Sequence, residues 1–342
     1  MKEKESLKLE IHACIEAITA SPRESALYQK LGDLQRQCGD SVGASKSYRS
    51  ATELRKHESD AKDTDAIITS SINNTDAYLN LLKDCLTYQL WDASDGSAFE
   101  VRISKPFISL ARIILRIKEF FKISTSDNRE FGLDWPAKAL TMAGKERLNN
   151  VEYCTKIVLQ ENIQGDLIET GVWSGGCTIF MRALLKSYGD KERSVWVADS
   201  FSGMPKPDKK QYPADKKFDL SMWKTLAVTS NEVRENFKRF GLLDDKVKFL
   251  EGWFSETLPK APIEQLAIIR LDGDLYESTM DALKHLYAKL SDGGFIIVDD
   301  YHCAAPCKQA IDEFREANNI TDEIVAIDWS AVYWRKNIDK TN

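Results

Sequence analysis

Residues 166–178 decide the fold of this chain, and they read Asp166-Leu-Ile-Glu-Thr-Gly171-Val-Trp-Ser-Gly-Gly-Cys-Thr178. The first five residues contain the apolar and β-branched side chains of a short buried strand. The glycines that follow permit a sharp turn, because glycine adopts backbone conformations that other residues rarely adopt. A helical stretch comes next. This order predicts the first unit of an α/β sheet, in which ligands bind beyond the carboxyl ends of the strands.

On both sides of this turn, short β-rich runs alternate with helical stretches, which predicts a mainly parallel sheet with crossover helices. We expect seven strands, at residues 166–172, 195–199, 247–252, 266–272, 295–300, 324–328 and 331–335. Only Trp329 and Ser330 separate the last two strands, which is too short for a parallel crossover. These strands should therefore form an antiparallel hairpin at the edge of the sheet.

Residues 7–58 read as helices, with a spacing that resembles a tetratricopeptide repeat of about 34 residues beginning at Ser25. Small residues at Gly32 and Ala44 would let two antiparallel helices approach closely, while Tyr48 fills the space between them. The other positions that fit are Tyr28, Leu31 and Ala51, with Pro22 and Ala17 closing a preceding half repeat. Two interpretations stay open: a repeat-like interaction or dimerisation module, and an ordinary helical hairpin packed on the rest of the protein.

The chain divides into four predicted segments. They are a helical, tetratricopeptide-like region at 1–58, a polar linker at 59–75, a helical connecting or cap region at 76–130, and the α/β domain at 131–342. Residues 105–122 combine dense apolar side chains with lysines and arginines, and such a helix can lie on an anionic membrane. An amphipathic helix more often packs on its own domain or on a second subunit, so membrane contact is disfavoured.

Composition excludes several classes of protein. With 342 residues, 43% apolar and 29% charged, the chain has the composition of a soluble protein of roughly two domains. A net charge of -6 gives no electrostatic reason to expect nucleic acid. Neither a signal core nor a membrane-spanning run is present in the sequence. The seven cysteines are an odd number without a Cys-x-x-Cys pair, which suits a reducing compartment and predicts a cytoplasmic protein.

Carboxylates stand at the ends of several predicted strands. Glu169 lies at the end of the first strand, Asp199 ends the second, Asp272 ends the fourth, and the pair Asp299 and Asp300 ends the fifth. Because ligands of such sheets bind at this edge, one pocket could collect Glu169, Asp272 and the pair Asp299 and Asp300. Their oxygens are suitable ligands for a hard cation such as Mg²⁺. The alternative is that aspartates at these turns cap the helices that follow.

The first turn is also similar to a cofactor-binding loop. Its Glu-x-Gly-x-x-x-Gly-Gly spacing differs from the Gly-x-Gly-x-x-Gly dinucleotide fingerprint and resembles the first motif of S-adenosylmethionine (SAM) methyltransferases. Asp199 stands where a carboxylate would accept hydrogen bonds from two ribose hydroxyls. The residues expected to bind the cofactor are Glu169, Thr170, Gly171, Trp173, Ser174, Gly175, Asp199, Ser200, Glu251, Gly252 and Asp272.

Four ordered motifs resemble the macrocin O-methyltransferase family, which are class I SAM-dependent enzymes that methylate sugar hydroxyls. The motifs are Ile168-Glu-Thr-Gly-Val-Trp-Ser-Gly-Gly176, Val197-Ala-Asp-Ser-Phe-Ser-Gly-Met-Pro205, Leu271-Asp-Gly-Asp-Leu-Tyr-Glu-Ser-Thr-Met280 and Gly293-Gly-Phe-Ile-Ile-Val-Asp-Asp-Tyr301. The resemblance covers about residues 131–336. It implies a Rossmann-like, seven-stranded α/β sheet with an antiparallel last strand, and it leaves the all-α N-terminal region outside.

The resemblance implies Mg²⁺-dependent methyl transfer from SAM to a sugar hydroxyl of a small molecule or glycan. Asp272, Asp299 and Asp300 would hold the ion, which orients the hydroxyl and lowers its pKa. Asp272 would receive the proton, with Asp274 as its substitute, and His302 could act as base, bind the acceptor or only pack. The family also favours a homo-oligomer, and the N-terminal helices could bind a protein partner. The alternatives are a phenol or catechol acceptor and a catalytically inactive scaffold.

Overall fold

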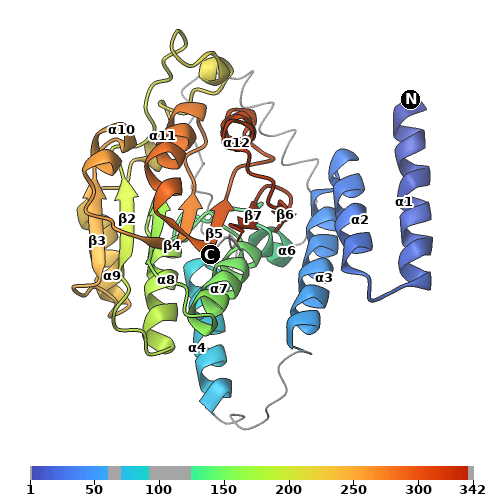
Figure 1. Cartoon of the computed structure of the whole chain (residues 1–342), viewed down its shortest axis with the longest axis horizontal. Coiled ribbons are helices and arrows are strands. Elements are labelled where there is room, and N and C mark those ends of the chain that lie inside the picture. Colours follow the sequence, from blue (N-terminus) through green and yellow to red (C-terminus); the bar gives the residue numbers. More distant parts are fainter. Residues whose placement is uncertain (1, 61–70, 92–124, 338–342) are drawn as a thin grey trace.

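The computed structural model describes residues 2–60, 71–91 and 125–337 (Figure 1). The strands are β1 (Asp166–Thr170), β2 (Val195–Asp199), β3 (Val247–Glu251), β4 (Leu266–Leu271), β5 (Leu290–Val298), β6 (Val325–Ala326) and β7 (Val332–Arg335). The helices are α1 (Lys2–Ala20), α2 (Ser25–Gln37), α3 (Ser41–Asp60), α4 (Ser71–Leu86), α6 (Thr125–Glu130), α7 (Lys145–Gln160), α8 (Gly176–Ser187), α9 (Ser230–Arg239), α10 (Phe254–Thr257), α11 (Tyr276–Leu286) and α12 (Ala305–Ala317), with short 3-10 helices at Pro213–Lys217, Lys224–Leu226, Leu258–Lys260 and Tyr287–Lys289.

All described strands form one seven-stranded sheet in the order β3-β2-β1-β4-β5-β7-β6. Strands β1 to β5 are parallel, while β7 runs antiparallel to β5 and β6 runs antiparallel to β7. The predicted sheet and its antiparallel edge hairpin are therefore confirmed. The chain builds outward from β1 to β3 and then returns to place β4 on the other side of β1. This reversal opens a crevice beyond the carboxyl ends of β1 and β4, where ligands of such sheets bind.

Helices cover both faces of the sheet. Helices α4, α7, α8 and α9 pack on one face, over side chains such as Leu167, Val197 and Ile268. Helices α10, α11 and α12 pack on the other, over Ile168 and Ile269 among others. Successive strand residues thus alternate between two cores, which explains why the central strands are apolar throughout. Both cores hold the strand ends rigidly in place beneath the crevice.

The N-terminal helices pack as their small residues predict. Helix α2 begins at Ser25, and a Cβ atom on Gly32 would lie 2.3 Å from the ring of Tyr48, so only glycine fits there. Ala44 and Tyr48 of α3 pack against Ala326 of β6, so α3 lies beside the β6–β7 edge of the sheet (Figure 1). Whether this region is an interaction module, and whether the chain forms a homo-oligomer, stay predictions.

Two segment boundaries differ from the sequence prediction. Helix α3 extends to Asp60 and α4 begins at Ser71, so the polar residues 59–60 and 71–75 are helical and not linker. Polar side chains can occupy the ends of helices that are anchored elsewhere by apolar residues. In α4 the anchor is Leu79, Leu82 and Leu86, which join the same core as α7 and α8. The linker at 61–70 and the basic amphipathic segment at 105–122 lie outside the described residues.

Within 2–60, 71–91 and 125–337, no helix has both the length and the apolar character required to cross a bilayer.

Candidate active site

Two adjoining cavities open at the carboxyl ends of the central strands. The first has a volume of about 270 Å³ and is lined by Ser200, Trp253, Phe254 and Gly273, among others. The second has a volume of about 310 Å³, and its lining includes Glu169, Trp173, Arg147, Asp274, Asp299, Asp300, Cys303 and Trp329. Gly171, Asp199, Gly203, Met204 and Asp272 line both. One elongated ligand could therefore occupy the first cavity and extend into the second.

Gly171 holds the wall between the cavities. Its φ of +87° lies in the region that favours glycine, and a Cβ atom there would lie 1.7 Å from the carbonyl oxygen of Asp272. The Asp272 amide also donates to the Thr170 carbonyl at 2.9 Å. The ends of β1 and β4 are thus locked together.

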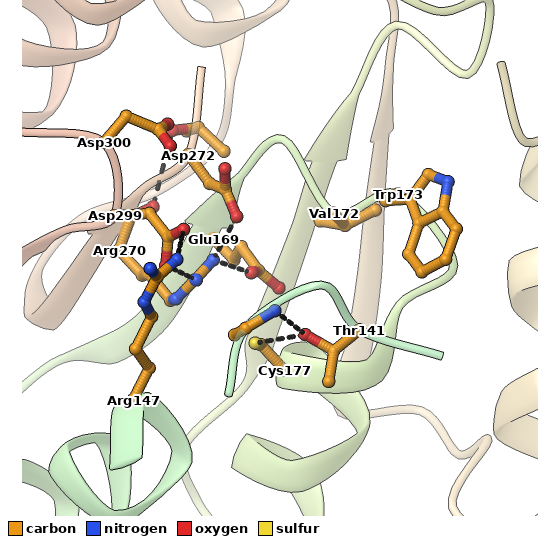
Figure 2. A network of polar contacts seen from close by, with 12 residues as sticks. Thr141, Arg147, Glu169, Val172, Trp173, Cys177, Arg270, Asp272, Asp299 and Asp300 are labelled. Carbon is orange, nitrogen blue, oxygen red and sulfur yellow. Dashed lines mark hydrogen bonds and ion pairs between the residues drawn. The ribbon is translucent and has the colours of Figure 1, made fainter. Parts of the chain in front are cut away.

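A buried ion pair lies directly beneath this turn. Glu169 is 1% exposed, and its Oε1 accepts a hydrogen bond from Nη1 of Arg270, which is fully buried on β4 (Figure 2). Glu169 Oε2 is buried without a hydrogen-bond partner in the protein. Burial is the main cause that raises the pKa of Glu169 to about 8. An unpaired carboxylate oxygen on the wall of the second cavity suits a cationic ligand group.

The Asp199 carboxylate is already engaged by the backbone. Its Oδ2 accepts from the amides of Val172 at 2.8 Å and Trp173 at 3.4 Å, and its Oδ1 accepts from Phe201 at 2.7 Å. Burial raises the pKa of Asp199 despite these bonds. The bonds fix the β1 turn to the end of β2, and a ribose would use the remaining lone pairs of a carboxylate that faces both cavities.

The other expected cofactor residues divide into two groups. Trp173 and Ser200 line the cavities, and the Trp173 indole nitrogen donates to the Thr225 carbonyl at 2.9 Å. The residues that line neither cavity are Thr170, Ser174, Gly175, Glu251 and Gly252. Trp253, which follows the last of these, does line the first cavity. The structure therefore brings together Glu169, Gly171, Trp173, Asp199, Ser200 and Asp272.

The three aspartates expected to bind metal converge. Asp272, Asp299 and Asp300 each offer an oxygen within 4.8 Å of the others. Asp300 Oδ2 is buried without a hydrogen-bond partner in the protein. Burial, followed by the charges of Asp274, Asp272 and Asp299, raises the pKa of Asp300 well above its usual range. An all-oxygen donor set with an unsatisfied buried carboxylate fits a hard divalent cation.

Asp274 follows in the same turn and has a strained backbone. Its φ is +56°, a region that residues other than glycine rarely adopt. It lines the second cavity, and burial together with Asp272 and Asp299 raises its pKa to about 7. The pKa of Asp272 rises to about 6, mainly through burial. A carboxylate with a pKa near neutrality is suited to receive a proton.

Sequence reasoning missed the cations of the site. Arg270 Nη1 donates to Asp272 Oδ2 at 2.7 Å, and its Nη2 pairs with Asp299 (Figure 2). Arg147 of α7 also pairs with Asp299 and reaches Asp328 Oδ2 at 2.7 Å. An arginine inside the otherwise apolar run 266–271 is the signal that could have indicated Arg270. No comparable pattern marks Arg147.

His302 is not placed as a base. It does not line either cavity, and its ring packs against Tyr301 with centroids 4.9 Å apart. Burial, with the positive charges of Arg36 and Lys308, lowers its pKa to about 3. A side chain with that pKa is a weak base, and the neighbouring Cys303 faces the second cavity in its place. The predicted role of His302 in proton transfer is therefore not supported.

A loop over the site supplies apolar side chains to the second cavity. They are Phe218, Leu220, Trp223 and Leu226. Asp215, which is fully buried, accepts from the amides of Tyr276 at 2.7 Å and Glu277 at 3.2 Å. These bonds join the loop to the start of α11, next to Asp274. The second cavity therefore has acidic residues at its floor and a partly aromatic rim.

Comparisons with known proteins agree with this geometry. A family model described as macrocin O-methyltransferase (TylF) matches residues 75–336. Demethyldecarbamoylnovobiocin O-methyltransferase of Streptomyces niveus is 51% identical over 209 residues, which are 61% of this chain and 80% of that protein. The 8-demethyl-8-(2,3-dimethoxy-alpha-L-rhamnosyl)-tetracenomycin-C 4'-O-methyltransferase of Streptomyces olivaceus is 52% identical over 211 residues, covering 61% and 80%. The solved structure of the O-methyltransferase NovP has a TM-score of 0.68 and 42% identity, covering 77% of this chain and 100% of that chain.

Proposed function

This chain belongs to the macrocin O-methyltransferase family and is a SAM-dependent O-methyltransferase, and we propose that it methylates a sugar hydroxyl of a glycosylated small molecule with the help of Mg²⁺. The observation that carries the proposal is the joined pair of cavities, with cofactor-type residues along both and an unsatisfied acidic cluster in the second. One relative is named for a rhamnosyl acceptor, which supports the choice of a sugar.

The cofactor would bind across the wall at Gly171. Trp253 and Phe254 offer apolar contact for adenine in the first cavity, and Asp199 offers oxygens for the ribose. Glu169 Oε2 would receive the amino group of the methionine part, because this oxygen is buried and lacks a partner. A carboxylate paired in this way forms a charge-assisted hydrogen bond, which is stronger than a neutral one.

The magnesium ion would be held by Asp272, Asp299 and Asp300. Glu169, Asp274 and Asp328 also lie in or beside this cluster, and in the part of the chain that the structure describes Arg147 and Arg270 pair with it. Carboxylates thus outnumber guanidinium groups, and an added divalent cation would relieve their repulsion. When bound, the ion would orient the acceptor hydroxyl and lower its pKa.

Asp274 is the residue that we favour as the base, with Asp272 as a ligand. In the transfer the hydroxyl oxygen forms a bond to the methyl carbon, the bond from that carbon to sulfur breaks, and the hydroxyl proton passes to an Asp274 oxygen. Its pKa near 7 suits this role, since it can accept the proton and release it again near neutral pH. Arg270 keeps Glu169 and Asp272 in fixed positions during the transfer.

A transfer assay with labelled SAM, Mg²⁺ and two classes of acceptor tests the function. Demethyldecarbamoylnovobiocin and 8-demethyl-8-(2,3-dimethoxy-alpha-L-rhamnosyl)-tetracenomycin C are the sugar-type probes, with catechol as the competing class. We expect label in a sugar-type product only when Mg²⁺ is present. Asp300→Asn should abolish turnover and leave binding of S-adenosylhomocysteine intact, whereas Asp292→Asn, which removes a surface carboxylate, should change neither. Full turnover in the presence of a chelator would refute the metal, and label only in catechol would refute the sugar acceptor.

A further inference from the structure

A hydrogen bond joins the N-terminal hairpin of α2 and α3 to a residue that lines the second cavity. The backbone amide of Trp329 donates to Ser45 Oγ of α3 at 3.1 Å. Ser45 is fully buried, and its hydroxyl hydrogen is directed to the Ser41 carbonyl at 2.9 Å, which leaves a lone pair for Trp329. Trp329 lies in the segment between β6 and β7. These two strands form the edge of the sheet beside which α3 lies (Figure 1).

The loop that Ser45 holds is built into the second cavity. Trp329 lines that cavity, and its indole nitrogen donates to the Phe131 carbonyl at 2.7 Å. Asp328, the preceding residue, holds Arg147, which in turn pairs with Asp299. The next residue donates as well, from Ser330 Oγ to the Asp299 carbonyl at 2.8 Å. Residues 328–330 therefore contact both the cavity and one of the three clustered aspartates.

Side-chain contacts hold the hairpin together and fix it to the α/β domain. Tyr48 fills the space above Gly32, and its hydroxyl donates to Asp33 at 2.7 Å. Arg49 of α3 pairs with Glu146 at 3.0 Å and with Glu130 at 2.7 Å, so the helix is fixed to the α/β domain on a second side. A displacement of α3 would consequently move the amide partner of Trp329.

Residues 1–74 lie outside the family match, which begins at residue 75. We propose that the N-terminal hairpin is part of the acceptor half of this active site and that Ser45 is a positioning residue, which sets Trp329 on the cavity wall. This inference rests on the proposed function only in that the second cavity receives the acceptor. The hydrogen bond from the Trp329 amide joins the hairpin to the second cavity.

Hydrogen–deuterium exchange of the full chain tests the link without any acceptor. Ser45→Ala removes the partner of the Trp329 amide, whereas Ser47→Ala on the same helix removes a bond to Gln35 inside the hairpin and serves as the matched control. We expect faster exchange of residues 327–333 in Ser45→Ala and no change there in Ser47→Ala. Identical exchange of these residues in the Ser45→Ala variant and the parent would overturn the inference.

Kinetics with demethyldecarbamoylnovobiocin separate a positioning role from a general loss of structure. Ser45→Ala should raise the KM for this acceptor about three- to tenfold, as expected for one lost hydrogen bond, while the KM for SAM stays within about twofold. Equal changes in both constants, or none, would overturn the inference. If the parent chain does not methylate this acceptor, the acceptor assignment is what fails, and the exchange experiment still decides the role of Ser45.

Discussion

A Cβ atom on Gly171 would lie 1.7 Å from the carbonyl oxygen of Asp272, so the cofactor-type turn after β1 and the acidic turn after β4 touch through their backbones. No side chain other than hydrogen fits between them. Gly171 and Asp272 line both cavities, so this contact forms part of the wall that the two cavities share. A substitution that moves either backbone should therefore change the shape of both cavities.

Gly171→Ala should therefore remove SAM binding and destabilise the protein. The added methyl group clashes with backbone and occupies a φ of +87°, so we expect a loss of stability above about 3 kcal/mol. Gly189→Ala is the control, since Gly189 has a φ of +76° and nothing within 4 Å, and should cost only about 1 kcal/mol. Denaturant unfolding and calorimetry with S-adenosylhomocysteine measure both effects, and equal losses in the two variants would contradict the clash.

Arg270→Met should destabilise the chain by about 3–5 kcal/mol, because it removes the shared cation of the buried Glu169 and Asp299 and of the half-buried Asp272. Added Mg²⁺ should recover part of this loss. Lys238→Met removes an exposed ion pair with Glu235 and should cost less than about 1 kcal/mol. Urea titrations with and without Mg²⁺ test the difference, and a neutral Arg270→Met variant would show that the pair is not needed for stability.

Glu169→Gln should weaken binding of S-adenosylhomocysteine by about 10- to 100-fold, as expected for a lost charge-assisted hydrogen bond. The pKa of about 8 adds a pH dependence: affinity of the parent chain should rise from pH 6 to pH 8 as Glu169 ionises. Titration calorimetry across this range should give a flat profile for Glu169→Gln. A parent profile equally flat would mean that Glu169 does not contact the amino group.

The contribution of three carboxyl groups at the site to the stability of the metal-free protein should fall as pH rises from about 4 to 8. The pKa values of Asp272, Asp274 and Glu169 are raised to about 6, 7 and 8, so the folded state keeps protons that the unfolded chain releases near pH 4. The stabilisation from these three carboxyl groups is complete below their pKa in the unfolded chain. It is lost as the pH rises through their pKa values in the folded protein. Mg²⁺ should therefore raise the Tm more at pH 8 than at pH 5.5. Thermal unfolding in NaCl at matched ionic strength is the control. A larger increase of the Tm by Mg²⁺ at pH 5.5 than at pH 8 would contradict the prediction.

His302→Gln and Asp274→Asn separate two of the three candidate bases, the third being Asp272. Asp274→Asn should lower kcat by about 100-fold or more, as loss of a general base does. His302→Gln should keep kcat within about threefold, because His302 lies outside both cavities. Single-turnover assays with saturating SAM make the comparison. A large loss in His302→Gln with unchanged folding would restore its catalytic role.

Much of the site was predictable because parallel strands carry their last residues to a common edge. Glu169, Asp199, Asp272, Asp299 and Asp300 all follow that rule and converge. His302 did not, since a residue further along the turn can point to either side, and here its ring packs on Tyr301. Arg147 could not be predicted at all, because it comes from a helix whose angle over the sheet is set by packing.

The sequence by itself determined the alternation of strands and helices along the chain, the glycine turn after β1 and the acidic residues at the strand ends. These features depend on local periodicity and backbone conformation. Only the tertiary structure decided that Arg270 pairs with Glu169, Asp272 and Asp299, and that Ser45 of the N-terminal hairpin accepts a hydrogen bond from Trp329 across an interval of 284 residues. Such contacts join segments far apart in the chain. Their geometry arises from how helices pack against the completed sheet, which no local pattern of residues encodes.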